Sequence, residues 1–348
     1  MTAKLLSSAA GERKALELAR ALYNQGRLDA AALVEQMVLK DGSAEAKHLW
    51  RLTQSARAPA NQHLLINNSQ RTRAFRTALE SVITPNCTVL EIGTGSGILS
   101  MLAACVGARH VYTCERQILM ARVADEIVKD NNLIDSITVI AKGADQLKLG
   151  AEIPERVDLI LCDVFTGSLL EAGGLGLVAR AAQNFLKPGG SIIPGFGAIR
   201  GELVGGEDLE ALCRCSNNDG MILRRFNLFS PTKLVLQPDQ FDKLEYQTYS
   251  EAFDCFDFKI GKSNGDQGEQ RSIEIEITKP GNVTGLLQWT DVELTPGVRL
   301  QAAPGESIRW PRFLHVFPEL VQIRSEQVMR LNLHHDGRQF SVWPSPLT

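Results

Sequence analysis

The stretch Val89-Leu-Glu-Ile-Gly-Thr-Gly-Ser-Gly97 decides the fold that this sequence predicts. An apolar run leads into Gly-x-Gly-x-Gly, and the apolar residues within 98–103 then recur at helical spacing. Glycines suit a turn at which the backbone bends sharply or a ligand comes close, because a Cβ would obstruct both. The stretch therefore predicts a strand, a tight glycine turn and a helix.

Two acidic residues limit the kinds of ligand that such a turn would bind. Glu115 closes the next apolar segment, where a carboxylate can accept hydrogen bonds from ribose hydroxyls. Asp163 follows the apolar segment 158–162, at the carboxyl end of a strand, where doubly wound sheets bind their ligands. The glycine spacing differs from both the dinucleotide fingerprint and the phosphate loop. A nucleoside without a diphosphate fits better than NAD, and we expect S-adenosylmethionine (SAM). The alternative is a sheet of the same kind without a ligand.

Composition limits the class of protein. The chain has 348 residues, 44% hydrophobic and 22% charged, which suits two globular domains. A net charge of −3 does not favour binding to nucleic acid or to an anionic membrane. No apolar run is long enough to span a bilayer. The start of the chain lacks the regions of a signal peptide. The seven cysteines include no Cys-x-x-Cys pair. We therefore expect a cytoplasmic, metal-free protein without nucleic-acid or membrane partners.

Strand and helix patterns alternate from residue 85 to 200, which favours a parallel sheet covered on both faces. The expected strands are 88–92, 110–114, 137–140, 157–162 and 190–199, and the expected helices are 97–106, 117–131 and 175–186.

Beyond residue 200 the pattern changes to apolar–polar alternation between Gly/Pro turns, as in residues 273–277, 285–294 and 326–333. This is typical of an antiparallel β-sandwich or barrel. The prediction is a helical region at 1–60, containing one hairpin similar to a tetratricopeptide repeat, a SAM-binding Rossmann-like domain at 61–198, and a β-barrel domain at 199–348. Residues 205–247 are less regular and are interpreted as an inserted arm.

Arg71 follows a helix N-cap at Asn68 or Ser69 and lies in the first turn, where a cation is unfavourable against the helix dipole. That placement suggests a bidentate bond to a ligand carboxylate, although a solvated helix face is the alternative. Ala144 and Asp145 follow the segment 137–140 and could face an adenine edge. The predicted cofactor-binding residues are Arg71, Glu91, Gly93, Thr94, Gly95, Gly97, Glu115, Ala144, Asp145 and Asp163.

Several stretches together resemble the protein arginine methyltransferases, most closely their monomethylating type III branch. These stretches are residues 64–75, 89–97 with Glu115, 249–258, 289–294, 309–310 and 334–343. The glycine stretch is shared by most class I methyltransferases, whereas the barrel stretches select this family. The resemblance covers residues 63–345 and implies a class I SAM-methyltransferase sheet followed by a β-barrel. It also implies that Arg71 binds the SAM carboxylate and that the 205–247 arm mediates a homodimer.

Two departures from the family pattern affect the acceptor site. The family's two substrate glutamates are nine positions apart; here Asp163 occupies the first position and Ala172 the second, with Glu171 one residue early. The family's Thr-His-Trp loop reads Ile-Arg-Trp, so that Arg309 replaces the histidine. The predicted catalytic residues are Asp163, Glu171 and Arg309.

Each of these three residues has an alternative. Asp163 could be a strand-end cap that touches SAM, and Glu171 a solvated loop charge. Arg309 could be a surface residue, or it could contact a substrate carboxylate such as that of free arginine.

The sequence thus predicts a SAM-dependent N-methyltransferase acting on a guanidino nitrogen of arginine, in a protein or peptide or as a free small molecule. One alternative is a methyltransferase for a different small-molecule N, O or C acceptor. Another is a non-catalytic SAM-binding scaffold. His334 and His335 are expected at a strand end beside a hairpin turn rather than as ligands.

Overall fold

The computed structural model describes residues 9–24, 43–55, 62–165, 168–170, 173–262, 267–306, 308 and 310–345. The chain forms two compact units, residues 1–67 and residues 68–348. The first unit contains helices α2 (Ala9–Asn24), α4 (Ala44–Ser55) and α5 (Gln62–Ile66). Ala19, Ala46 and Leu49 are buried where α2 packs on α4. Residues 25–42, which include the second half of the predicted hairpin, lie outside the described residues.

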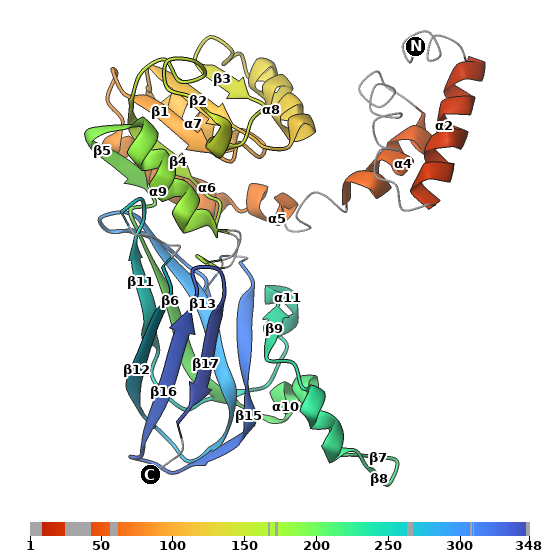
Figure 1. Cartoon of the computed structure of the whole chain (residues 1–348), viewed down its shortest axis with the longest axis vertical. Helices are drawn as coiled ribbons and strands as arrows, with labels where there is room; N and C mark the ends of the chain where they lie inside the picture. The colour runs from red at the N-terminus through yellow and green to blue at the C-terminus, as the bar shows by residue number, and fades with distance from the viewer. Residues whose placement is uncertain are drawn as a thin grey trace. The chain divides into compact units, whose positions relative to one another are not determined.

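The second unit begins with a parallel sheet in the order β3-β2-β1-β4-β5 (Figure 1). Its strands are β1 (Thr88–Ile92), β2 (His110–Cys114), β3 (Ile137–Ile140), β4 (Val157–Cys162) and β5 (Leu186–Ile193). Strand β1 is buried throughout. The order reverses between β1 and β4, so the carboxyl ends of these two strands border the crevice in which doubly wound sheets bind ligands.

Helices precede and connect these strands. They are α6 (Ser69–Val82), α7 (Ile98–Val106), α8 (Ile118–Asp130) and α9 (Gly174–Phe185), with the short 3-10 helix η1 (Ala144–Gln146) after β3. Helices α7 and α8 present apolar faces to the sheet, as Leu99 and Leu102 of α7 and Ala121 and Ala124 of α8 are buried. The Rossmann-like fold predicted from the glycine stretch is confirmed.

The prediction of a single strand at 190–199 is wrong. The structure has two strands in different sheets, β5 and β6 (Phe196–Gly205), with Pro194 and Gly195 between them. Proline has no N–H to donate to a ladder, so a strand does not continue through it in the middle of a sheet. The N–H of Gly195 donates to the carbonyl of Glu293, which already belongs to the second sheet.

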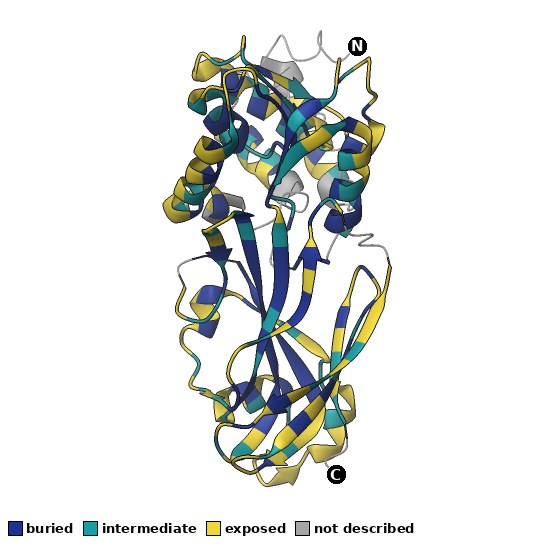
Figure 2. Ribbon diagram, turned by 90° about the vertical axis from the view of Figure 1, so that its left-hand side faces the viewer, coloured by how far each residue is buried: buried dark blue, intermediate teal, exposed yellow. Residues whose placement is uncertain are grey.

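The rest of the unit is antiparallel. One sheet has β10 (Gln247–Thr248), β6, β13 (Gly281–Thr295), β15 (Arg312–Ile323) and β9 (Lys233–Leu236) in that order, with β11 (Phe253–Lys259) and β14 (Val298–Gln301) paired to β6 and β13. Another has β12 (Glu269–Glu276), β16 (Val328–His335) and β17 (Phe340–Pro344). Buried residues run along the strands of both sheets (Figure 2). The antiparallel β domain predicted from the alternating segments is therefore confirmed.

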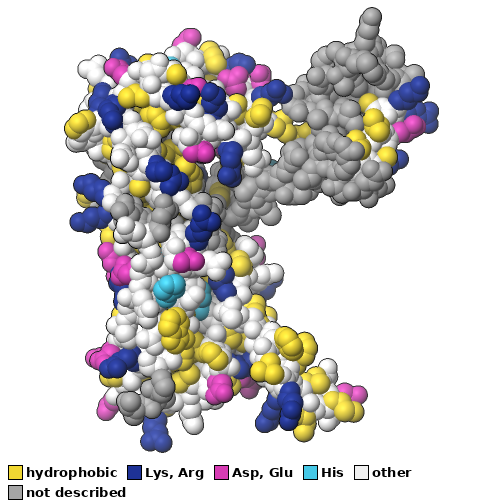
Figure 3. Space-filling view, in the orientation of Figure 1, with side chains coloured by type: hydrophobic (Ala, Val, Ile, Leu, Met, Phe, Trp, Pro, Cys, Tyr) yellow, Lys and Arg dark blue, Asp and Glu magenta, His cyan; other side chains and the backbone are white. Residues whose placement is uncertain are grey.

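The segment after β6 leaves the sheet before it returns as β9. It contains α10 (Glu207–Cys213), the hairpin β7 (Asn217–Asn218) and β8 (Met221–Ile222), and the 3-10 helix η3 (Arg224–Phe229), and α11 (Pro238–Phe241) follows β9. Its tip exposes large apolar side chains, which gather on one part of the surface (Figure 3). They are Met221, Ile222, Phe226, Leu228 and Phe229.

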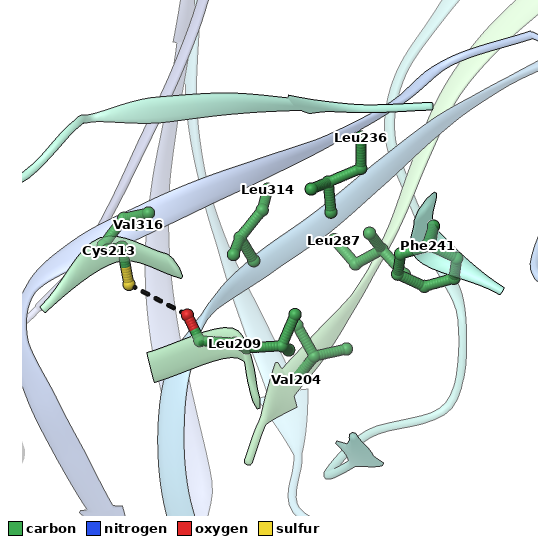
Figure 4. Close-up of a cluster of buried hydrophobic side chains, with 8 residues drawn as sticks. All are labelled: Val204, Leu209, Cys213, Leu236, Phe241, Leu287, Leu314 and Val316. Carbon is green, nitrogen blue, oxygen red and sulfur yellow. Dashed lines mark hydrogen bonds between the residues drawn. The ribbon is translucent and has the colours of Figure 1, made fainter. Parts of the chain in front are cut away.

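The base of this segment is anchored on the sheet by a buried apolar cluster (Figure 4). Leu209 and Cys213 come from α10, and Phe241 comes from α11. They pack on side chains of β6, β9, β13 and β15, namely Val204, Leu236, Leu287, Leu314 and Val316. The outer face of the antiparallel sheet is therefore covered by the segment whose tip stays exposed.

Candidate functional site

The glycine turn follows β1 at the carboxyl edge of the parallel sheet. Gly93, Gly95 and Gly97 have φ values of +85°, +54° and +79°, in the left-handed region that favours glycine. A Cβ on Gly93 would also lie 3.0 Å from Cγ1 of Val164. The N–H groups of Gly93 and Thr94 donate to the carbonyl of Cys114 at 3.0 and 3.1 Å. The turn is thus held against the end of β2, and its backbone can approach a ligand.

Glu115, directly after β2, lies at this turn. Its Oε2 accepts a hydrogen bond from the Gly95 N–H at 3.3 Å, and its Oε1 accepts one from the Gln117 N–H at 2.9 Å. The side chain is only half-buried. A carboxylate fixed in this way beside a glycine turn can accept hydrogen bonds from the hydroxyls of a ribose.

Glu91 and Thr94 have side chains that face the protein interior. The Glu91 carboxylate accepts hydrogen bonds from Ser100 Oγ and, at 2.7 Å, from Thr113 Oγ1. The Thr94 hydroxyl lies 2.6 Å from that of Thr113. Burial raises the pKa of Glu91 to about 7, and the two hydrogen bonds oppose the rise. This network ties β1, β2 and the first turn of α7 together behind the glycine turn.

Arg71 and Asp163 are brought into contact across the crevice. Arg71 Nε donates to Asp163 Oδ2 at 2.7 Å, and Nη2 forms an ion pair with the same oxygen. The two side chains are 7% and 10% exposed. Asn68 caps α6 by accepting from the Arg71 N–H at 2.9 Å, and the guanidinium lies 5.1 Å from the ring centre of Phe75. The first turn of α6 thereby delivers a cation to the end of β4.

Ala144 and Asp145 lie in η1, beyond the carboxyl end of β3. Ala144 is buried and Asp145 is exposed. The Asp145 carboxylate turns back over Gly143, where an added Cβ would lie 2.5 Å from its Oδ1. The predicted cofactor-binding residues therefore gather at one edge of the sheet, where Arg71, the glycine turn, Glu115, η1 and Asp163 follow or face the ends of β1 to β4.

Two of the predicted catalytic residues, Glu171 and Arg309, lie outside the described residues, as does Ala172. Their described neighbours are buried: Leu169 and Leu170 on one loop, and Ile308 and Trp310 on the other. His334 and His335 end β16 and precede the turn to β17, so the expected strand end beside a hairpin is confirmed.

Sequence reasoning missed the partners of Glu91. Thr113 lies directly opposite Glu91 in the pairing of β1 with β2, and Ser100 lies in the first turn of α7. The signal was present, because a carboxylate inside a buried strand requires hydrogen-bond donors nearby. A hydroxyl nine residues later and another at the facing strand position supply them.

The described residues contain neither a cluster of metal ligands nor a membrane-spanning helix. Among the described residues, no group of three or more His, Cys, Asp and Glu side chains is placed to hold a metal ion. In the same part of the chain, no helix has the length and apolar composition needed to cross a membrane.

A glycine turn after β1, an acid after β2 and a parallel sheet of this order form a Rossmann-like domain, which is followed by antiparallel sheets. The family model for ribosomal protein L11 methyltransferase (PrmA) matches residues 70–199. An arginine N(omega)-methyltransferase of Streptomyces achromogenes subsp. streptozoticus is 30% identical over 240 residues, which are 69% of this chain and 66% of that protein.

Protein arginine N-methyltransferase 7 of Oryza sativa subsp. indica is 28% identical over 249 residues, 66% of this chain and 34% of that protein. The chain thus matches about a third of the rice relative and just under two thirds of the Streptomyces relative. These matches make the chain similar to the arginine methyltransferases.

Two solved structures share the fold. The Trypanosoma brucei PRMT1 enzyme–prozyme heterotetrameric complex with AdoHcy has a TM-score of 0.67 and 24% identity, covering 78% of this chain and 86% of that chain. Arabidopsis thaliana protein arginine methyltransferase 10 has a TM-score of 0.66 and 21% identity, covering 80% of this chain and 88% of that chain.

Proposed function

We propose that this protein is a SAM-dependent N-methyltransferase that transfers a methyl group to a guanidino nitrogen of arginine, either in a protein or peptide or as a free amino acid. The observation that carries the proposal is the buried contact of Arg71 with Asp163. It brings a cation suited to a cofactor carboxylate and an acid suited to a guanidinium to one point, at the switch of strand order. The names of the Streptomyces and rice relatives support the same chemistry.

The residues present fit SAM. The glycine turn leaves room that a Cβ would fill, Glu115 presents a half-buried carboxylate to a ribose, and Ala144 with Asp145 borders the space for an adenine. Arg71 would hold the cofactor's carboxylate through a forked, charge-assisted bond. When bound, SAM supplies an electrophilic methyl group on its sulfonium.

The protein's part in the reaction is to position the acceptor and manage its charge. A guanidinium stays protonated at neutral pH, since its pKa lies far above 7. Asp163 would orient one guanidino nitrogen toward the methyl group and offset the positive charge, which is a matter of positioning and electrostatics rather than covalent catalysis. Glu171 is proposed as the second carboxylate of this grip and as a route for the departing proton. Arg309 is proposed to contact a carboxylate of the substrate.

The test is mass-resolved methyl transfer from SAM, with free L-arginine and an arginine-rich peptide offered in the same tube. We expect a gain of one methyl mass on at least one of them. No transfer to either, with SAM still bound in a calorimetric titration, would overturn the guanidino acceptor and favour another small-molecule nucleophile. Absence of SAM binding would overturn the methyltransferase proposal itself.

We also propose a homodimer. The arm exposes 67% of Met221, 79% of Ile222, 88% of Leu228 and 78% of Phe229, and a contiguous apolar surface of this kind usually marks a protein interface. Sedimentation at micromolar concentration tests it, with Phe229→Glu as the variant expected to shift the protein to monomer. A monomeric wild-type protein would contradict the proposal.

The proposed location is the cytoplasm. Cys105 and Cys215 are exposed free thiols, which suit a reducing compartment. Fractionation of the host cell, with the protein followed by an antibody, tests this location.

A further inference from the structure

A small hollow opens on the antiparallel domain, apart from the predicted cofactor residues. Its volume is about 210 Å³ when open solvent is included, and its enclosed part has room for about one water-sized group. The side chains around it are Ser168, Lys233, Gln288, Phe313, His315, Arg338, Gln339 and Phe340. Gln288 of β13 lies directly opposite Phe313 of β15, and His315 lies two positions further along β15. Two adjacent strands therefore form the floor.

The floor contains an unpaired polar group. Gln288 and His315 are 2% and 4% exposed, and Gln288 Oε1 lies 2.7 Å from His315 Nε2. This bond leaves Gln288 Nε2 buried without a hydrogen-bond partner. A buried donor without a partner destabilises the folded protein. A ligand that accepts a hydrogen bond in the hollow would remove that destabilisation.

His315 stays neutral in this position. Burial lowers its pKa to about 3, with a further lowering from the charge of Lys233. A neutral imidazole has one N–H, and donation of that N–H from Nε2 to Gln288 Oε1 fixes which end of the amide carries the unpaired N–H groups. His315 is therefore a positioning residue for the Gln288 amide.

The rim of the hollow is cationic. Lys233 and Arg338 are both exposed, and the Lys233 ammonium lies 5.0 Å from the ring centre of Phe313. None of the eight described lining residues is acidic. Asp336, two positions before Arg338, already accepts the N–H groups of Arg338 and Gln339 at 2.8 and 2.7 Å. The hollow thus combines two cations with a buried amide donor, which is a setting for an anion.

The hollow also borders the loop that leaves β4. Ser168, which is 6% exposed, forms part of its wall and lies five positions after Asp163. An anion in the hollow would therefore lie close to the loop that carries the proposed acceptor acid.

We infer that this hollow is a carboxylate subsite for the methyl acceptor, in which Gln288 Nε2, Lys233 and Arg338 bind a carboxylate that is covalently part of the acceptor. The inference rests on the proposed function and deepens it, because it names the second recognition element of the substrate. The carboxylate has two sources, the α-carboxylate of free arginine or an acidic side chain near an arginine in a peptide.

The test compares acceptors that keep the guanidino group and differ in the carboxylate. L-arginine is compared with L-argininamide and agmatine, and an Arg-Glu peptide with the matching Arg-Gln peptide, in the methyl-transfer assay at saturating SAM. We expect the carboxylate-bearing member of at least one set to have a KM lower by about tenfold, the scale of one or two hydrogen bonds to a charged group. The first set identifies the free amino acid as the source, and the second identifies the peptide side chain.

The variants are Lys233→Met, Arg338→Met and Gln288→Leu, with Lys243→Met, an exposed lysine in another part of the chain, as the matched control. Each of the three is expected to raise the KM of the carboxylate-bearing acceptor several-fold while leaving kcat and the KM of its neutral analogue unchanged. Lys233 and Arg338 are exposed, so their replacement leaves the fold intact even if Gln288→Leu destabilises it.

Each outcome bears on the subsite separately from the proposed function. Equal KM values within both sets of wild-type acceptors overturn the subsite, and so does an unchanged KM in Lys233→Met and Arg338→Met. Methylation of arginine or peptide in either case leaves the proposed function standing. No methylation of any guanidino acceptor overturns the proposed function, and the subsite with it.

Discussion

Two nitrogens of the Arg71 guanidinium contact one carboxylate oxygen of Asp163, which lies 92 positions further along the chain. Nε donates to Asp163 Oδ2 at 2.7 Å, and Nη2 forms an ion pair with the same oxygen. The first turn of a helix and the end of a central strand meet at this point. Each side chain offsets the charge of the other in a site where both are largely removed from water. A ligand carboxylate that binds Arg71 would take the place of Asp163, and a substrate guanidinium that binds Asp163 would take the place of Arg71.

Replacement of Asp163 by Asn should reduce both stability and turnover. The guanidinium of Arg71 would stay buried without its counter-charge, and breaking a buried pair typically costs about 3–5 kcal/mol. Urea denaturation measures this loss, and methyl transfer should fall by at least about a hundredfold, the scale typical of a lost electrostatic contact at a reacting group. The matched control is Arg330→Ala, which breaks the exposed pair of Arg330 with Glu274. An exposed pair contributes only about 0–1 kcal/mol. Equal losses in the two variants would contradict the importance of the buried pair.

Glu91 should make stability depend on pH. Burial raises its pKa to about 7 from an ordinary value of 4.5, so between these values the folded state binds more protons than the unfolded state. Stability from this group is therefore fully present below pH 4.5 and is lost as pH rises toward 7, by about 3 kcal/mol in all. The amide oxygen of Gln can still accept hydrogen bonds from Ser100 and Thr113, so Glu91→Gln should fold.

The measurement is urea denaturation of the wild type and Glu91→Gln at pH 5 and pH 8. The wild-type free energy of unfolding should fall relative to that of the variant on going to pH 8. Parallel behaviour of the two proteins would show that Glu91 has an ordinary pKa in the folded state.

The Gly93→Ala variant should lose SAM affinity. Its φ of +85° is unfavourable for alanine, and the new Cβ would lie 3.0 Å from Val164 Cγ1, at the end of β4. Gly150 is the matched control, because its φ is +81° and no atom lies within 4 Å of an added Cβ. Both alanine variants should lose about 1–2 kcal/mol of stability from the left-handed backbone. Only Gly93→Ala should weaken SAM in calorimetry; a similar weakening in Gly150→Ala would mean that strain, and not the local space, is responsible.

The parallel half of the fold could be read from the sequence because its signals are local. The strand at 88–92, its glycine turn and the strand at 110–114 fall where the apolar runs place them. The prediction of a single strand at 190–199 was wrong because an apolar run does not show which sheet it joins. Pro194 divides this run between two strands in different sheets. The pairing of Gln288 with His315 was hidden for a different reason: it depends on the register of two long strands, which no residue pattern within either strand specifies.

Arg312 was also hidden, and its position leads to the last prediction. The side chain is 1% exposed, Nε donates to the carbonyl of Ala302 at 2.9 Å, and Nη2 donates to that of Ala303 at 2.7 Å. The guanidinium also lies 3.6 Å from an oxygen of Asp242. It thereby fixes the start of the loop that leads to Trp310 and carries Arg309.

Arg312→Lys should loosen that loop. One ammonium does not reproduce the fork that reaches two carbonyls and a carboxylate, so we expect a loss of about 2–3 kcal/mol in urea denaturation. If the loop positions the acceptor, the KM for the acceptor should rise while SAM affinity in calorimetry stays unchanged, because the predicted SAM-binding residues lie on other elements. Arg299→Lys, at an arginine side chain that is 56% exposed, is the control and should change neither quantity. A drop in stability without a change in acceptor KM would assign Arg312 a structural role alone.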